Sequence, residues 1–70
     1  MTEKRVARVT DIIAASPTSF EDAVKVGFER AVKTLRGVTG VKVIEQRVSV
    51  DNDAILEYRV RLEVIFILES

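Results

Sequence analysis

Alternating apolar and charged residues near the end of the chain constrain its fold more than any other sequence feature. Every second residue from Leu56 to Leu68 is apolar or aromatic, and charged residues fill most of the positions between them. Successive side chains of a strand point to opposite faces, so this pattern predicts a strand with one buried and one polar face. Ile65 and Ile67, however, stand where the alternation requires charge. A strand that is apolar on both faces needs cover on both, so we expect a second copy of the chain to cover these isoleucines.

Three segments are predicted to be strands of one sheet. They are rich in β-branched residues and bounded by turn formers, and they span Val6–Ile13, Val41–Val50 and Ala54–Leu68. A three-residue turn, Asp51–Asp53, is predicted between the last two strands, with Val50 paired to Ala54, because it places their apolar residues on one face. The same register predicts two opposite-charge pairs across the strands. These pairs are Glu45 with Arg59 and Arg47 with Glu57.

One amphipathic helix is predicted between the first two strands. Ser19 followed by Asp22 is typical of a capping box, in which two residues at a helix start exchange hydrogen bonds. Gly27 lies on or beside the apolar face, and a glycine there costs about 1 kcal/mol of helix propensity but lets a strand approach closely. Gly37 is predicted to end the helix in the left-handed conformation. The apolar positions with helical spacing are Phe20, Val24, Phe28, Ala31, Val32 and Leu35.

The order of these elements predicts a single α+β domain over residues 1–70. Strand, helix, strand and strand can form an all-antiparallel sheet only with the third strand in the centre, in the order 1-3-2, wrapped around one helix. A chain of 70 residues buries only about 60% of the surface that its unfolded form exposes. Small domains usually gain further stability from disulfides, metals or partner chains. The sequence contains no cysteine and no histidine, so oligomerisation is the expected source of stability.

The composition argues against several classes of function. Eleven basic and eleven acidic residues cancel, and aromatic residues are few, so no nucleic-acid partner is expected. No apolar run reaches the ~20 residues that span a bilayer, and no apolar signal core follows the charged start, so a cytoplasmic location without membrane contact is expected. No nucleophile–base pair is recognisable in a chain without histidine or cysteine, so we expect that it is not an enzyme.

The length, the element order and three segments together resemble the dodecin family. The segments are the junction Ala14–Ser16, the helix stretch "ERAVKTLRGV" and the final strand from Tyr58 to Leu68. The resemblance covers nearly the whole chain. It implies a hollow homododecamer built of trimers, with helices outside and sheets facing inward. It also implies that charged residues of the last two strands face a water-filled interior.

The resemblance further implies a flavin site, and both of its recognition positions are substituted here. Dodecins stack flavins in pairs on a tryptophan near the start of the second strand, and a glutamine in the third strand hydrogen-bonds the ring edge. These positions fall on Gly40, or Val41 if the alignment slips by one, and on Arg59; the chain has no tryptophan. We therefore do not expect flavin to be bound. The segment Ile44–Gln46 is similar instead to the calcium-binding dodecins.

Carboxylates on the strands are the candidate ligands of a hard cation, calcium or magnesium. Glu45 is the first choice, because rotation axes could gather several copies of it, and Asp11 within the first strand is the second. Each candidate also has a purely structural explanation. Glu45 could simply pair with a neighbouring arginine, and Asp51–Asp53 could simply be a polar turn. Gly40 could be a turn glycine. Arg59 and Arg61 could also bind the phosphate or carboxylate of a ligand.

The sequence therefore predicts a non-catalytic, dodecameric binding or storage protein for a divalent cation or a small ligand. One alternative is a dodecin that sequesters flavin. The other is a structural or partner-binding assembly with no ligand of its own.

Overall fold

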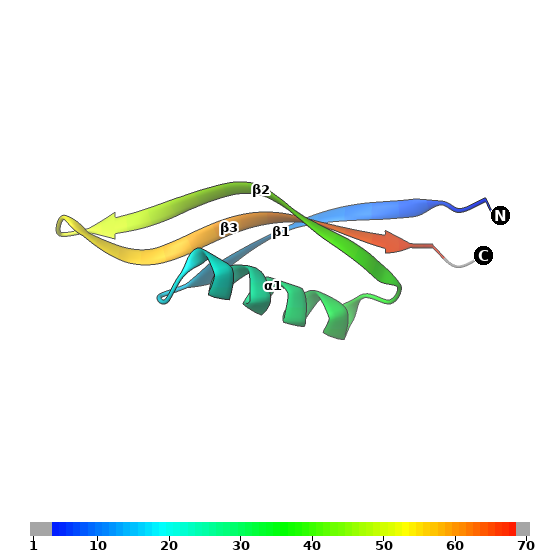
Figure 1. Ribbon diagram of the computed structural model, residues 1–70, viewed down its shortest axis with the longest axis horizontal. Coiled ribbons are helices and arrows are strands. Elements are labelled where there is room, and N and C mark those ends of the chain that lie inside the picture. The colour runs from blue at the N-terminus through cyan, green and yellow to red at the C-terminus, as the bar shows by residue number, and fades with distance from the viewer. Residues whose placement is uncertain (1–3, 69–70) are drawn as a thin grey trace.

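The computed structural model describes residues 4–68, and this part of the chain folds into one helix and three strands (Figure 1). The elements are β1 (Ala7–Ser16), α1 (Phe20–Thr34), β2 (Val38–Asp51) and β3 (Ala54–Ile67). The sheet order is β1-β3-β2 and both pairings are antiparallel, which confirms the predicted α+β topology with the third strand in the centre. Both outer strands are longer than predicted: β1 continues to Ser16, and β2 begins three residues earlier, at Val38.

Helix α1 covers one face of the sheet and packs close to it. The buried apolar residues are Val60, Leu62 and Val64 of β3, Ala14 of β1, and Ala23 and Ala31 of α1. A Cβ added to Gly27 would lie only 2.6 Å from Leu62 Cδ1 and 3.1 Å from Ala14 Cβ. This confirms that Gly27 permits the close approach of a strand.

The predicted apolar face of the helix is only partly correct. The residues that contact the sheet most closely are the small ones at positions 23, 27 and 31, which recur every four residues. Phe28 and Val32, predicted to pack inward, are each 44% exposed. The helix backbone lies close to the sheet, so only small side chains fit between the two. The larger apolar side chains lie beside this contact and stay partly exposed.

Both ends of α1 differ in detail from the sequence prediction. The Asp22 N–H donates to Ser19 Oγ at 3.0 Å, so the cap is confirmed. The Asp22 carboxylate does not return to Ser19 as a capping box requires, but accepts from the buried Ser16 hydroxyl at 2.6 Å. Gly37 has the predicted positive φ of 73°, yet the helix already ends at Thr34, with Leu35 extended.

The hairpin between β2 and β3 is where the sequence prediction is wrong. Asp51 pairs with Ala54, so the turn has two residues, Asn52 and Asp53, both with positive φ. Such a turn matches the twist of the strands, and Asn and Asp tolerate this conformation. Register shifts between Ser49 and Val50 and between Val43 and Glu45 then change which residues pair. A bulge of this kind adds an unpaired residue and resets the alternation of faces.

The isolated chain is more extended than its length requires. Its radius of gyration is 14.6 Å, whereas a compact domain of 70 residues has about 11 Å. Its surface of 5459 Å² exceeds the about 4,400 Å² expected for its mass. The β2–β3 hairpin projects beyond α1 and exposes apolar residues near its tip (Figure 1). Within residues 4–68, no helix is long and apolar enough to cross a bilayer.

Candidate functional site

The face of the sheet opposite α1, here called the open face, carries most of the charged strand residues. Val60, Leu62 and Val64 point to the helix, so the odd-numbered residues between them point away. Directly paired residues of neighbouring strands share a face, which assigns the rest from the register. The open face therefore presents Glu57, Arg59, Arg61, Glu63 and Ile65 of β3, Lys42, Glu45 and Arg47 of β2, and Val9, Asp11, Ile13 and Ala15 of β1.

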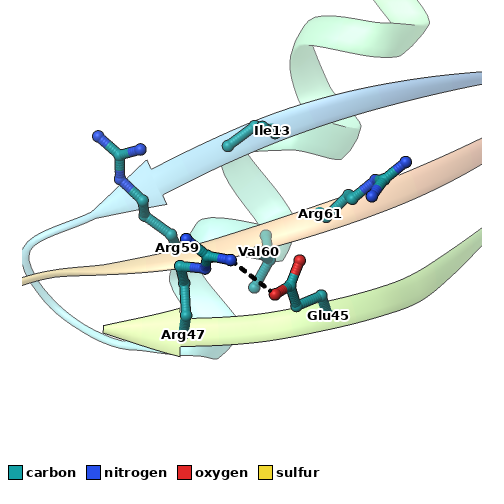
Figure 2. Close-up of a pocket in the computed structure, with 6 residues that line it drawn as sticks. All are labelled: Ile13, Glu45, Arg47, Arg59, Val60 and Arg61. Carbon is teal, nitrogen blue, oxygen red and sulfur yellow. Dashed lines mark hydrogen bonds and ion pairs between the residues drawn. The ribbon is translucent and has the colours of Figure 1, made fainter. Parts of the chain in front are cut away.

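A hollow of about 250 Å³ lies in the open face (Figure 2). It is lined by Ile13 of β1, Glu45 and Arg47 of β2, and Arg59, Val60 and Arg61 of β3. Ile13 is 68% exposed, so it places an apolar surface beside the three arginines. The hollow thus combines basic, acidic and apolar groups from all three strands.

Ion pairs on this face differ from those predicted. Glu45 pairs with Arg47 at 2.8 Å and Glu57 with Arg59 at 2.6 Å, in both cases along one strand. The predicted pairs Glu45 with Arg59 and Arg47 with Glu57 are wrong, because the shifted register places Glu45 opposite Arg61.

A third ion pair does cross between strands. Arg61 Nη2 donates to Asp11 Oδ2 of β1 at 2.8 Å. This contact joins the central strand to β1 at the edge of the hollow, and it engages one of the two carboxylates predicted as cation ligands.

These contacts shift the titration of three groups. The hydrogen bond and charge of Arg47 lower the pKa of Glu45, and the more distant charge of Arg61 adds to this. The same bond raises the pKa of Arg47, and the bond to Asp11 raises the pKa of Arg61. Each of these pKa shifts favours the charged form of its group.

The structure places the two candidate cation ligands on one face but does not bring them together. Glu45 lies opposite Arg61 on β2, and Asp11 lies on β1, so the central strand separates them. Two strand spacings correspond to roughly 10 Å. The described residues of a single chain contain no group of three or more acidic side chains able to hold a metal ion. A cation held by these carboxylates would need ligands from a neighbouring copy.

The two family flavin positions are also on the open face, well apart. Gly40 lies opposite Ile65, six residues along β3 from Arg59, which corresponds to about 20 Å. Gly40 belongs to β2, so the reading of it as a turn glycine is wrong. A Cβ there would meet only Ile65 Cδ1, at an ordinary 3.6 Å, so a side chain would fit.

Among residues 4–68, no aromatic side chain lies on the open face. Tyr58 and Phe66 are on the helix side of β3, and Tyr58 stacks edge-on against Phe20 with ring centroids 5.1 Å apart. The remaining aromatic residue, Phe28, is on α1. A flavin ring on the open face of one chain would therefore find no aromatic partner from that chain.

Three residues of this face were not singled out as site residues by the sequence. Ile13 and Arg47 line the hollow, and Glu63 lies opposite Asp11 in the register of β1 and β3. Their grouping depends on the register of both pairings, and the three register shifts between β2 and β3 hid that register from the alternation pattern.

Comparisons with known proteins agree with this architecture. A family model described as Dodecin matches residues 6–69. The calcium dodecin of Mycobacterium tuberculosis is 41% identical over 61 residues, which cover 87% of this chain and 86% of that protein. Among solved structures, the dodecin from Streptomyces coelicolor has a TM-score of 0.92 and 28% identity, covering 99% of both chains. The crystal structure of M. tuberculosis calcium dodecin, described as having a novel calcium-binding site, has a TM-score of 0.81 and 39% identity, covering 91% of both.

Proposed function

The chain belongs to the dodecin family of small, non-catalytic binding proteins, and from this premise we propose that it forms a dodecamer that binds a divalent cation, calcium or magnesium. The observation that carries the proposal is the 41% identity to calcium dodecin over most of both chains. The carboxylates of the open face supply the oxygen ligands that such cations prefer.

The dodecamer is supported by the shape of the single chain. The sheet is covered on one face only, and the chain has more surface and a larger radius than a compact domain of its size. Val9, on the open face beside Ile65, is 55% exposed in the single chain. In the proposed assembly of trimers, a neighbouring copy covers this end of the face, including Ile65 and Ile67, and the charged part faces the interior.

The cation site is proposed to form between copies, with Glu45 as the first ligand and Asp11 as the second. Each carboxylate must leave an arginine to bind the cation, and both ion pairs lie between substantially exposed side chains. Exposed pairs are weak, so a divalent cation can displace them. Where a rotation axis gathers like carboxylates, their repulsion favours cation binding further.

A flavin-sequestering function is the weaker candidate, and an assembly without any ligand is the other. The family positions for flavin carry Gly40 and Arg59, and the open face lacks an aromatic side chain. Stacked aromatic pairs contribute about 0.5–1.5 kcal/mol each beyond area burial. We expect titration with riboflavin to give little fluorescence quenching; submicromolar quenching would overturn this part of the proposal.

Melting curves with and without millimolar calcium test the cation proposal. Calcium should raise the melting temperature of the wild type by mass action. Glu45→Gln should lose most of this shift, and Asp11→Asn part of it, whereas Glu29→Gln on the exposed side of α1 should keep it. No shift in the wild type would remove the cation proposal and leave an assembly with no such ligand. An equal shift in the wild type and both site variants would place the cation elsewhere.

Light scattering tests the assembly separately. The expected mass is near twelve times the 7.8 kDa of one chain. A stable monomer at micromolar concentration would contradict the dodecamer. The cytoplasmic location expected from the sequence stays a prediction, which cell fractionation would test.

A further inference from the structure

Helix α1 covers only part of its side of the sheet. That part, with Val60, Leu62 and Val64 at its centre, is here called the covered face. The residues of β2 that pair with the helix-side residues of β3 point to the same side, and they are Val41, Val43, Gln46 and Val48. None of these four is charged, whereas charged residues lie between them on the open face. The helix side of β2 therefore suits an apolar neighbour.

One flank of α1 borders this part of β2. Phe20 and Val24 pack against the core, and Phe28 and Val32 continue their row at four-residue spacing. Both β1 and β2 are antiparallel to β3, so the link through α1 joins two strands that run in the same direction. Such crossovers are right-handed as a rule, and in that hand the flank of α1 that carries Phe28 faces β2.

Four exposed apolar side chains lie together here, and they are called the β2 patch. They are Phe28 and Val32, each 44% exposed, Val43, 40% exposed, and Val48, 37% exposed. Val43 is the register partner of Leu62, which lies against Gly27, so Val43 is level with the middle of the helix. Isolated exposed apolar residues are common, but several together mark an interaction site, in which aromatic residues are enriched.

A second copy of this chain is the partner that suits the β2 patch. The charged residues on the same flank of α1, Glu21 and Lys25, have opposite signs, so two copies would not repel each other there. The single chain exposes about 1,000 Å² more than a compact domain of its mass, which is more than the about 800 Å² that one partner covers in a standard interface. The contact proposed above around Val9 and Ile65 lies on the opposite face of the sheet, so the neighbour that covers it cannot also cover the β2 patch.

The geometry of assembly also requires a second contact, an argument that rests on the proposed dodecamer. One kind of contact closes copies into a pair or a ring, so trimers join into a closed shell only through another kind. We propose that the β2 patch is buried against a neighbouring copy and forms a contact separate from the one around Val9 and Ile65. Each chain would then be held in the assembly from both sides of its sheet.

Sedimentation velocity of charge variants of the full chain tests this proposal. Phe28→Glu and Val9→Lys each place a charge in one of the two contacts, where an unpaired buried charge is costly. Each single variant should leave an assembly of more than one and fewer than twelve chains, because the other contact remains. The double variant should be a monomer. Val26→Glu is the matched control, because Val26 is 45% exposed but lies on the other flank of α1, and this variant should stay dodecameric.

The outcomes separate this proposal from the dodecamer itself. A wild type that is not dodecameric would contradict the proposed assembly and, with it, the second contact. A dodecameric wild type with an equally dodecameric Phe28→Glu would overturn the second contact alone. So would a double variant no smaller than the single variants, because both substitutions would then act on one contact, and so would equal dissociation of Val26→Glu.

Circular dichroism would establish that each variant folds. Should Phe28→Glu fail to fold, Phe28→Ser takes its place, since it shortens the contact without adding a charge. It should dissociate at a higher protein concentration than the wild type, by mass action. Dissociation of both proteins over the same concentration range would overturn the proposal.

Discussion

The two faces of the sheet are built on different principles, although β3 supplies the centre of both. The covered face is tightly packed: Val60, Leu62 and Val64 are buried, and Leu62 lies too close to Gly27 to leave room for a Cβ there. The open face is wet and charged, with its ion pairs exposed and a hollow at its centre. The covered face is satisfied by the chain itself, whereas the open face keeps donors and apolar surface for other molecules. The following changes test that difference, from the largest expected effect to the smallest.

A truncation on each face should give the largest contrast. Leu62→Ala on the covered face should lower the free energy of unfolding by about 2–5 kcal/mol, since it leaves a cavity under α1. Ile13→Ala on the open face removes a side chain of similar size but should cost less than about 1 kcal/mol. Urea unfolding measures the free energy of unfolding of both variants. All samples need the same protein concentration, because the stability of an oligomer rises with concentration. Equal losses would show that the open face is as tightly packed as the covered one.

Replacing a glycine by valine should also destabilise the covered face more than the open face. Gly27→Val should cost about 1–3 kcal/mol, because its Cβ would overlap the fully buried Leu62. Gly40→Val, beside Ile65 on the open face, meets only an ordinary contact within its own chain, so it should cost clearly less than Gly27→Val. Thermal melting of the two variants under identical conditions compares them. A tolerated Gly27→Val would mean that α1 does not need its close approach to the sheet.

The buried hydrogen bonds that attach α1 to β1 are expected to contribute less. Ser16→Ala removes the hydroxyl that donates to Asp22 and accepts from the Thr18 N–H at 3.0 Å. Its loss should cost about 1–2 kcal/mol. Thr34→Ala, which loses only contacts of 3.4 Å at the exposed helix end, is the control and should change stability little. If both variants unfold at the same urea concentration, the Ser16 bond does not contribute to stability.

The pH dependence of the open face should be the smallest effect. The pKa of Glu45 is lower in the folded chain than its ordinary value, because Arg47 stabilises the carboxylate. The stabilisation is therefore complete above the unfolded pKa, near 4.5, and is lost as pH falls through the lower folded value. Glu45→Gln should flatten the stability curve below the unfolded pKa, near pH 4.5, and leave its slope at neutral pH unchanged. Parallel curves for the two proteins would show that the pair contributes nothing measurable.

Much of the covered face was readable from the sequence. The alternation in β3 identifies Val60, Leu62 and Val64 as core, and all three are buried on the side of the sheet that α1 covers. The role of Gly27 was also predictable. A glycine in the middle of a helix forms no turn, so close packing of a neighbouring strand is the explanation that remains. These features are local, and one element determines each of them.

The open face was predictable in composition but not in arrangement. The sequence identified the charged residues of β3 and named Glu45, Asp11 and Arg59, and all three lie on this face. It paired them wrongly, because the turn has two residues and three register shifts follow it along the β2–β3 pairing. Bulges leave little trace in an alternation pattern, since the extra residue can be apolar, as Ile44 is here.

The sequence by itself determined the order of the elements, the central strand, the buried face and the loss of both flavin-recognition residues. The first three follow from periodicity and turn chemistry, and the last from the residues found at the positions that the family resemblance assigns to flavin recognition. Only the tertiary structure decided which charges meet: that Arg61 binds Asp11, that Arg47 faces Arg59, and that Ile13 borders their hollow. The physical reason is that a shift of one residue in register exchanges every partner across a sheet while it leaves the composition of each strand unchanged.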